Sequence, residues 1–260
     1  MNTHTSPGRK LASLLLPLFL TIHSLAQHTD STRSEKHFSG SIQLTQNGIA
    51  LVPTFSLGKP AAIFLLTVGG KRFSVEPDFR FALSGKPWTM LLWFRYRPQH
   101  TGRLNLTFGV HPALNFRTQT DLVNNEAIEH LVARPFLATE VSPQVNLNKN
   151  LQLGSYYLFS RGFDKQVAKY NHFLAIQGSL HGLSLPGKLA LRVNPQVYFL
   201  KQDERQGYFF SSQFSLSQKK IPFSLTTLIN KRISGNIAGA KDFVWNLTLA
   251  YSFYQAYHRK

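Results

Sequence analysis

Charged side chains that alternate with apolar ones are the residues of this chain whose types and spacing could carry chemistry. In residues 71–83, Arg72, Glu76, Asp78 and Arg80 share one parity, and mostly aromatic or aliphatic side chains share the other. Guanidinium groups that gather in an interior attract anions, whereas guanidiniums that face carboxylates pair with them. The alternation defines a set of candidate lumen-lining residues: Arg72, Glu76, Asp78, Arg80, Arg95, Arg97, Arg103, His111, Arg117, Arg134, Glu140 and Arg192.

Motifs of enzymatic chemistry are absent from the sequence, which contains no phosphate-binding P-loop, HExxH, EF-hand loop or GxSxG. Ser155 and His172 are the remaining candidates, as the Ser and His of a lipid-cleaving enzyme. If the segments flanking residues 162–169 pair symmetrically, His172 lies beside Phe159, about four residues from Ser155 and beyond hydrogen-bond reach. We therefore expect no catalytic residue, no metal and no cofactor, and we place His172 in an aromatic belt.

The element that must position these side chains is a β-strand that crosses a membrane. Side chains of a strand point to opposite faces with period two. Residues 103–117 follow this pattern, with His111 and Asn115 on one face and Phe108 and Leu114 on the other. The apolar face is almost unbroken over roughly ten residues, the length of a tilted transmembrane strand. The sequence therefore predicts an all-β fold, a transmembrane antiparallel up-and-down β-barrel.

About twelve such strands are predicted, an even number as in bacterial barrels. The first is expected over 40–57, with a bulge at Asn47 and Gly48 that resets its phase; a hairpin there would instead add a separate strand. Short turns are predicted at 69–70, 148–150 and 186–187. Longer polar connections are predicted at 118–130, 162–169, 202–206 and 235–240. This alternation indicates periplasmic turns at one end and extracellular loops at the other.

The ends of the chain carry export features. Residues 1–26 are predicted to be a signal peptide, with Arg9 and Lys10 before an apolar core and small residues before the expected cleavage site. The remaining predicted parts are a periplasmic lead-in (27–39), the outer-membrane β-barrel (40–253) and a C-terminal tail (254–260). An outward row that ends at Phe253 resembles the C-terminal recognition signal of outer-membrane barrels, although the tail follows it. The expected location is the bacterial outer membrane.

Four stretches carry a resemblance to known sequences: PTFSLGKPAAIF (53–64), EPDFRFALSGKPW (76–88), NPQVYFLK (194–201) and KDFVWN (241–246). With them, residues 40–253 resemble a Bacteroidota-type outer-membrane β-barrel protein family. None of the stretches is a catalytic motif. The resemblance therefore implies a barrel in the outer membrane and carries over no activity.

The chain is strongly basic, with 29 Lys and Arg against 12 Asp and Glu. These basic residues are scattered singly, without the block or recognition helix of a nucleic-acid-binding protein, so no nucleic-acid partner is expected. The basic excess favours a narrow pore whose cationic lumen prefers small anionic solutes. The alternative is a closed structural or partner-binding barrel in which charges pair and fill the interior. The expected partners are outer-membrane lipid, small anionic solutes and other envelope proteins.

Aromatic residues fit a membrane girdle better than a carbohydrate-stacking site. Trp88 and Trp245 are therefore expected to face lipid. Trp93 shares the inward parity of its strand and is expected to narrow the lumen.

Overall fold

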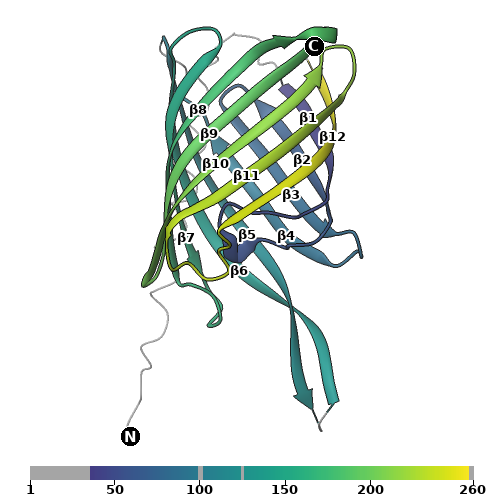
Figure 1. The fold of residues 1–260 in the computed structure, drawn as a ribbon, viewed down its shortest axis with the longest axis vertical. Helices are drawn as coiled ribbons and strands as arrows, with labels where there is room; N and C mark the ends of the chain where they lie inside the picture. Colours follow the sequence, from purple (N-terminus) through teal and green to yellow (C-terminus); the bar gives the residue numbers. More distant parts are fainter. Residues whose placement is uncertain (1–35, 99–101, 124–125, 258–260) are drawn as a thin grey trace, which may run out of the picture. The chain divides into compact units, whose positions relative to one another are not determined.

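The computed structural model describes residues 36–98, 102–123 and 126–257. The predicted signal peptide (1–26) and residues 27–35 of the predicted lead-in lie outside the described residues. The described residues form one closed barrel of twelve antiparallel strands, in which consecutive strands pair and β1 pairs with β12 (Figure 1). The fold class and the strand number predicted from the sequence are therefore confirmed.

The strands follow one another round the barrel in chain order. Their bounds are β1 (Lys36–Thr45), β2 (Ala61–Gly70), β3 (Phe73–Ala82), β4 (Pro87–Tyr96), β5 (Leu104–Val123), β6 (Glu126–Asn146), β7 (Leu151–Gly162), β8 (Tyr170–Leu185), β9 (Leu189–Gln202), β10 (Arg205–Gln218), β11 (Phe223–Gly235) and β12 (Phe243–Tyr257). Because β12 pairs with β1, every strand has two partners, and the sheet has no open edge to leave backbone groups unpaired. Among the described residues, no helix is long and apolar enough to cross a membrane.

The outer surface of the barrel is apolar. Each strand carries at least one exposed large apolar side chain. On β5, Phe108, Val110 and Leu114 are exposed, whereas the alternate residues His111 and Asn115 are only 5% exposed. A closed sheet with such side chains on its outer face is suited to lipid and not to water. The outward and inward faces therefore follow the predicted alternation.

The seam between the first and last strands is longer than predicted. Lys36 pairs with Tyr257, and Thr45 pairs with Thr248. The strands thus extend beyond the predicted boundaries at 40 and 253, and the described part of the predicted tail belongs to the wall. This pairing satisfies the backbone hydrogen-bonding groups at the seam. The end residues alternate only weakly between apolar and polar, so the sequence pattern does not reveal that they belong to strands.

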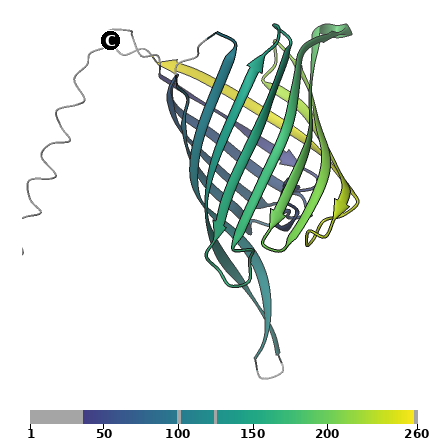
Figure 2. The same ribbon diagram turned by 90° about the vertical axis from the view of Figure 1, so that its left-hand side faces the viewer.

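The predicted polar loop is at 118–130, but residues 118–123 continue β5 and residues 126–130 belong to β6. Thr118 pairs with Leu131, and Val123 pairs with Glu126. The two strands run past the rim of the barrel as a hairpin (Figures 1 and 2). The polar side chains of this region therefore reflect a strand that has left the lipid, and not the end of the strand. We call this end of the barrel the hairpin end.

The connections differ between the two ends. The longer ones at the hairpin end are 46–60, 163–169 and 236–242. Short ones at the opposite end, which we call the turn end, are 71–72, 147–150 and 186–188. The predicted connection at 202–206 is shorter than expected, because only Asp203 and Glu204 separate β9 from β10. The others agree closely with the predicted pattern of short turns and longer connections.

Residues 46–60, which we call the inner segment, fold into the barrel. β1 ends at Thr45, and the segment closes on itself where the Gly48 amide donates to the Lys59 carbonyl at 2.8 Å. The predicted strand over 40–57 is therefore confirmed for residues 40–45 only, and both the bulge at Asn47 and Gly48 and the alternative hairpin there are wrong. Leu51, which lies within the predicted strand, instead packs against buried side chains of the interior.

Candidate functional site

A network of paired charges lines the interior from β3 to β6. The Arg95 guanidinium donates to both oxygens of Glu140, at 2.6 Å from Nε and 3.3 Å from Nη2, and also donates to Glu76. Arg97 donates to Glu76 at 2.7 Å, and the Tyr156 hydroxyl donates to Glu140 at 2.7 Å. Two guanidiniums therefore face two carboxylates, and their charges cancel.

Gly109 allows two members of this network to meet across an intervening strand. The strand register places it beside Arg95 of β4 on one side and beside Glu140 of β6 on the other. A Cβ atom at this position would lie 2.6 Å from Oε1 of Glu140. The missing side chain therefore provides the space through which the carboxylate reaches the guanidinium.

Arg80 forms a separate pair with Asp78 on the same strand. Its Nε and Nη2 atoms lie 2.8 Å and 2.6 Å from the two carboxylate oxygens, a bidentate arrangement. The basic excess predicted that Arg80, Arg95, Arg97 and Arg117 would be only partly matched by carboxylates such as Glu76 and Asp78. Arg80, Arg95 and Arg97 all pair with carboxylates, so this side of the interior resembles the ion-pair ladder of the closed-barrel alternative.

An aromatic stack lies next to the charge network. Trp93 faces inward and is 8% exposed, and its ring centroid lies 3.9 Å from that of His111. The Cζ atom of Arg95 lies 4.1 Å from the Trp93 ring centroid, a cation–π contact. Trp93 thus fills interior space as predicted, and His111 packs against it.

Trp88 is also inside the barrel, contrary to the prediction that it faces lipid. It is fully buried, and its Nε1 donates to the Phe55 carbonyl at 2.7 Å. The register between β3 and β4 shifts between Arg80 and Phe81, which leaves Trp88 as an extra residue of β4. An extra residue reverses the direction of a side chain, and simple alternation cannot reveal it.

Interior side chains from several strands hold the inner segment. The Tyr198 hydroxyl lies 2.9 Å from the Leu51 carbonyl oxygen, and Gln202 donates to the Thr54 hydroxyl at 3.1 Å. Arg117 donates to the Thr54 carbonyl on another side. Together with Trp88, these contacts tie the segment to β4, β5 and β9.

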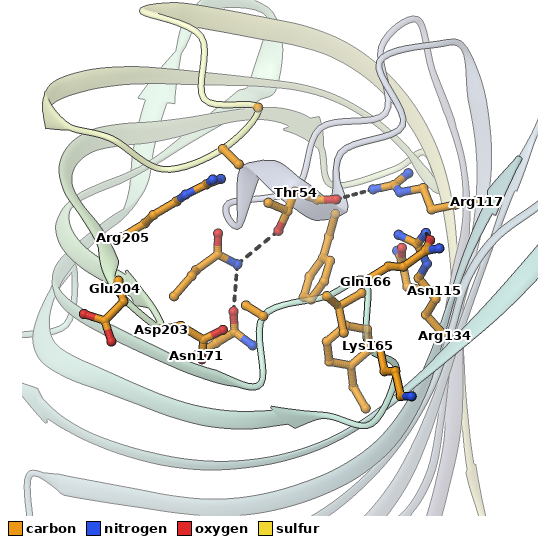
Figure 3. A pocket seen from close by; sticks show the side chains of 17 residues that line it. Thr54, Asn115, Arg117, Arg134, Lys165, Gln166, Asn171, Asp203, Glu204 and Arg205 are labelled. Carbon is orange, nitrogen blue, oxygen red and sulfur yellow. Dashed lines mark hydrogen bonds between the residues drawn. The ribbon is translucent and has the colours of Figure 1, made fainter. Parts of the chain in front are cut away.

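A cavity of about 540 Å³ lies at the hairpin end, beside Thr54 and Phe55 of the inner segment (Figure 3). We call it the outer cavity. Its charged lining residues are four basic ones, Arg117, Arg134, Lys165 and Arg205, and two acidic ones, Asp203 and Glu204. The Asp203 carboxylate accepts the backbone amides of Lys169 and Tyr170 at 2.8 Å each. The cavity therefore carries a net positive lining, with one of its two carboxylates already occupied.

In the part of the chain that the structure describes, three buried N–H groups without a hydrogen-bond partner belong to residues of the outer cavity. Among the described residues, Asn115 Nδ2, Arg134 Nε and Asn171 Nδ2 are buried without a hydrogen-bond partner in the protein. Asp164 approaches Arg134 only to 4.0 Å. A ligand rich in acceptor oxygens is the chemical complement of such donors.

A second cavity of about 400 Å³ lies nearer the turn end and borders Leu51 of the inner segment. We call it the inner cavity. No charged residue lines it, and its amide side chains are Gln144, Gln152, Gln177, Asn194, Gln196 and Gln213. The positive lining of the outer cavity therefore does not extend into the inner cavity.

The other predicted lumen-lining residues are dispersed. Arg72 and Arg103 lie in connections at the turn end, outside β3 and β5, and not in the strands as predicted. Arg192 is exposed on β9, opposite Ser215 of β10. Of the predicted set, Arg117 and Arg134 are the two that reach the outer cavity.

Sequence reasoning missed several residues of the outer cavity. Lys165 and Arg205 lie in or beside predicted loops, where strand parity assigns no direction. Asn171 is buried on an inward position of β8, where alternation was sufficient to find it, whereas Gln202 is buried at the end of β9 and was assigned to the predicted connection 202–206. Thr54 lies within the strand predicted over 40–57. Its place in the outer cavity could be found only once the path of the inner segment was known.

The candidate enzyme pair does not form. His172 pairs with Phe159 and Ser155 pairs with Ile176 across β7 and β8, as the symmetric hairpin predicted. The His172 ring lies 5.2 Å from the Phe159 ring, and its Nδ1 lies 2.9 Å from the Tyr157 hydroxyl. Among the described residues, no group of three or more His, Cys, Asp or Glu residues could hold a metal ion.

Comparison with known proteins supports the fold. No protein-family model and no curated protein matches the sequence. The NanC porin is similar to this chain with a TM-score of 0.51 and 9% sequence identity, over 82% of this chain and 98% of that chain. A KdgM porin in complex with disordered oligogalacturonate has a TM-score of 0.47 and 10% identity, over 84% of this chain and 99% of that chain. At such identities, the likeness to NanC concerns the fold alone.

The closed wall, its apolar outer face and this likeness define a class of protein. The chain is an outer-membrane β-barrel with a porin-like fold.

Proposed function

We propose that the barrel is a narrow channel for small anionic solutes, which it selects in the outer cavity. The observation that carries this proposal is Arg117, whose guanidinium reaches the cavity without a carboxylate partner among the described residues. Figure 3 shows it beside Thr54. A partly buried guanidinium without a counter-charge favours a nearby anion.

The neighbouring charge strengthens this preference. Arg134 of β6 pairs with Asn115 and so lies diagonally across from Arg117 of β5. Two guanidiniums in adjacent interior positions repel each other unless an anion or water lies between them. An oxyanion such as a carboxylate would accept hydrogen bonds from both, and also from the unpartnered amides of the same cavity.

The selectivity of single channels tests this proposal. We expect the protein in a planar bilayer to prefer anions in a salt gradient, and the Arg117→Glu, Arg134→Glu variant to prefer cations. The control is Lys219→Glu, Lys220→Glu, which makes the same change of charge in the connection between β10 and β11 and should retain anion preference. Cation preference of the unsubstituted protein would refute the proposal.

A closed structural or partner-binding barrel is the second candidate, and the inner segment supports it. Leu51 and Val52 pack against the interior cluster of Phe173, Tyr198 and Phe209, between the two cavities. The paired charges of β3–β6 fill further space on another part of the wall. An absence of conductance, in the unsubstituted protein and in a variant without the inner segment, would favour this function.

The remaining proposals concern the setting of the barrel. We place the hairpin end outside the cell, because longer connections lie there and short ones at the turn end. We also propose that the protein is a member of the Bacteroidota-type family and that it contacts other envelope proteins. We further propose that it acts as a channel and not as an enzyme.

A further inference from the structure

We propose that Arg161, His172 and Lys201 form a binding site for the phosphate groups of an outer-leaflet lipid. These three residues, which we call the rim patch, lie on adjacent strands β7, β8 and β9. They are independent of the lumen and of the proposed channel function, whereas their place in the outer leaflet rests on the orientation proposed above.

The strand register brings the rim patch together on the outer wall. His172 pairs directly with Lys201, and Arg161 pairs with Tyr170, which places Arg161 diagonally beside His172. Directly paired residues have Cβ atoms about 5 Å apart, and diagonal ones about 7 Å, within reach of long side chains. One phosphate group can therefore contact all three side chains.

Burial shows that the rim patch faces outward. Lys201 is exposed and lies between the buried residues Leu200 and Gln202 of β9. Arg161 is likewise exposed between buried Ser160 and Gly162. The next outward residue after His172 on β8 is Leu174, which is 47% exposed on the apolar outer wall.

The position of the patch along the strands is that of the membrane interface. Arg161 is the penultimate residue of β7, His172 the third residue of β8 and Lys201 the penultimate residue of β9. All three therefore lie at the hairpin end, where the apolar wall meets the connections. Aromatic rings of Phe159, Tyr170 and Phe199 surround them at outward positions, as in an interfacial girdle.

The positive charge of the patch is unmatched. Among the described residues, no carboxylate pairs with any of the three side chains, and the adjacent Asp203 binds backbone amides instead. Arg161 contacts the Phe163 ring at 5.3 Å, and His172 uses Nδ1 for Tyr157, which directs Nε2 to other partners. Charges at the edge of an apolar wall are complementary to a lipid whose acyl chains cover the wall and whose phosphates sit above it.

The test uses the full purified chain in detergent micelles and lipid A, a diphosphorylated acylated glucosamine disaccharide, as the probe. Native mass spectrometry measures the apparent affinity. We expect Arg161→Gln, Lys201→Gln to bind lipid A about tenfold more weakly, the effect of losing two partly solvated charge contacts. The control Lys219→Gln, Lys220→Gln removes the same charge at exposed positions of the turn end and should bind as the unsubstituted protein does.

Two further measurements test whether the rim patch binds the phosphate groups of the lipid and whether it acts independently of ion selectivity. Dephosphorylated lipid A should bind the unsubstituted protein about tenfold more weakly, with no further loss in the Arg161→Gln, Lys201→Gln variant. Ion selectivity should not change in that variant, so failure of this site and failure of the channel proposal are distinguishable. Equal binding by the patch variant and the control, or equal binding of both lipids, would overturn the proposal. Lys201→Gln alone provides the same comparison if the double variant does not fold.

Discussion

Gly109 determines how the interior charges pair, because its missing side chain lets Arg95 and Glu140 meet across β5. Alternation in the sequence was enough to place Arg95, Glu76 and Glu140 in the interior. It could not identify partners, because these depend on the register between strands that lie tens of residues apart. The sequence therefore predicted which charged residues lie in the interior, but not that the guanidiniums and carboxylates of the network pair and cancel each other's charge.

Gly109→Ala tests this arrangement. The added methyl group would lie 2.6 Å from a carboxylate oxygen that Arg95 holds in place, so one of these groups must move. We expect the free energy of unfolding in lipid vesicles to fall by about 1–3 kcal/mol. Gly178→Ala on β8 is the matched control, since its methyl group would meet nothing closer than 3.5 Å. Equal losses at both positions would contradict the role of Gly109.

Substitutions on β5 test the assignment of the two faces. Phe108 is exposed on the outer wall, whereas the adjacent Thr107 pairs with Ser142 on the interior side. Phe108→Arg should lower the free energy of unfolding by about 2–4 kcal/mol, because the charge enters lipid near the midplane. Thr107→Arg should be tolerated, and similar losses for both variants in urea unfolding would reject the register.

At the scale of elements, the inner segment is a part of the fold that the alternation of apolar and polar residues could not predict. Leu51 and Phe55 share the parity of a lipid-facing strand, but they pack on interior groups, with Phe55 4.9 Å from the Phe136 ring. The same apolar residue types occur on the lipid-facing wall and in the interior, where they fill space, so residue type does not distinguish the two positions. Only the contacts of the folded barrel distinguish them, so the outer cavity that the segment borders could not be derived either.

Replacement of residues 50–56 by a Gly/Ser chain of equal length tests whether the inner segment restricts the lumen. The replacement removes the Leu51, Thr54 and Phe55 side chains from between the cavities. The backbone contacts with Tyr198 and Trp88 should also weaken, since nothing then packs beside them. We expect single-channel conductance to rise several-fold. A Gly/Ser replacement of 219–222 should leave conductance unchanged, and equal conductance of all three proteins would show that the segment is no barrier.

The β5–β6 hairpin shows a second limit. Its polar sequence predicted a region outside the lipid, and the hairpin runs past the rim of the barrel (Figure 1), but polarity does not distinguish a loop from a strand pair. Cross-strand hydrogen bonds continue from Thr118 to Val123, and Lys86 of the neighbouring connection lies 3.5 Å from Glu129. The sequence therefore predicted the environment of this element and not its conformation.

At the scale of the whole molecule, orientation in the membrane can be measured directly. An epitope tag inserted between Asn124 and Asn125 follows β5 at the hairpin end. We expect antibody to label it on intact cells, because the longer connections should face outward. A tag placed between Lys219 and Lys220 should be labelled only after lysis. The opposite result would reverse the topology and move the rim patch to the inner leaflet.

The overall architecture was the most predictable feature, because period-two alternation reports which face meets lipid in most strands. Strand number, closure and an apolar outer wall all follow from it. The outer cavity was less predictable, because half of its basic residues, Lys165 and Arg205, belong to or border connections. Residues in connections have no fixed face, so their direction depends on how the connection packs.

Pairing of β1 with β12 also imposes an order on assembly. The seam joins residues about two hundred positions apart, such as Thr45 and Thr248, so its closure has the largest loop-closure cost of any strand pair and we expect it to form last. The inner segment directly follows β1, and it makes contacts with β9 inside the finished wall. It must therefore enter while the seam is still open, or thread through the rim afterwards. Refolding of a chain without the inner segment should consequently be faster than that of the full chain, with the difference confined to the last phase.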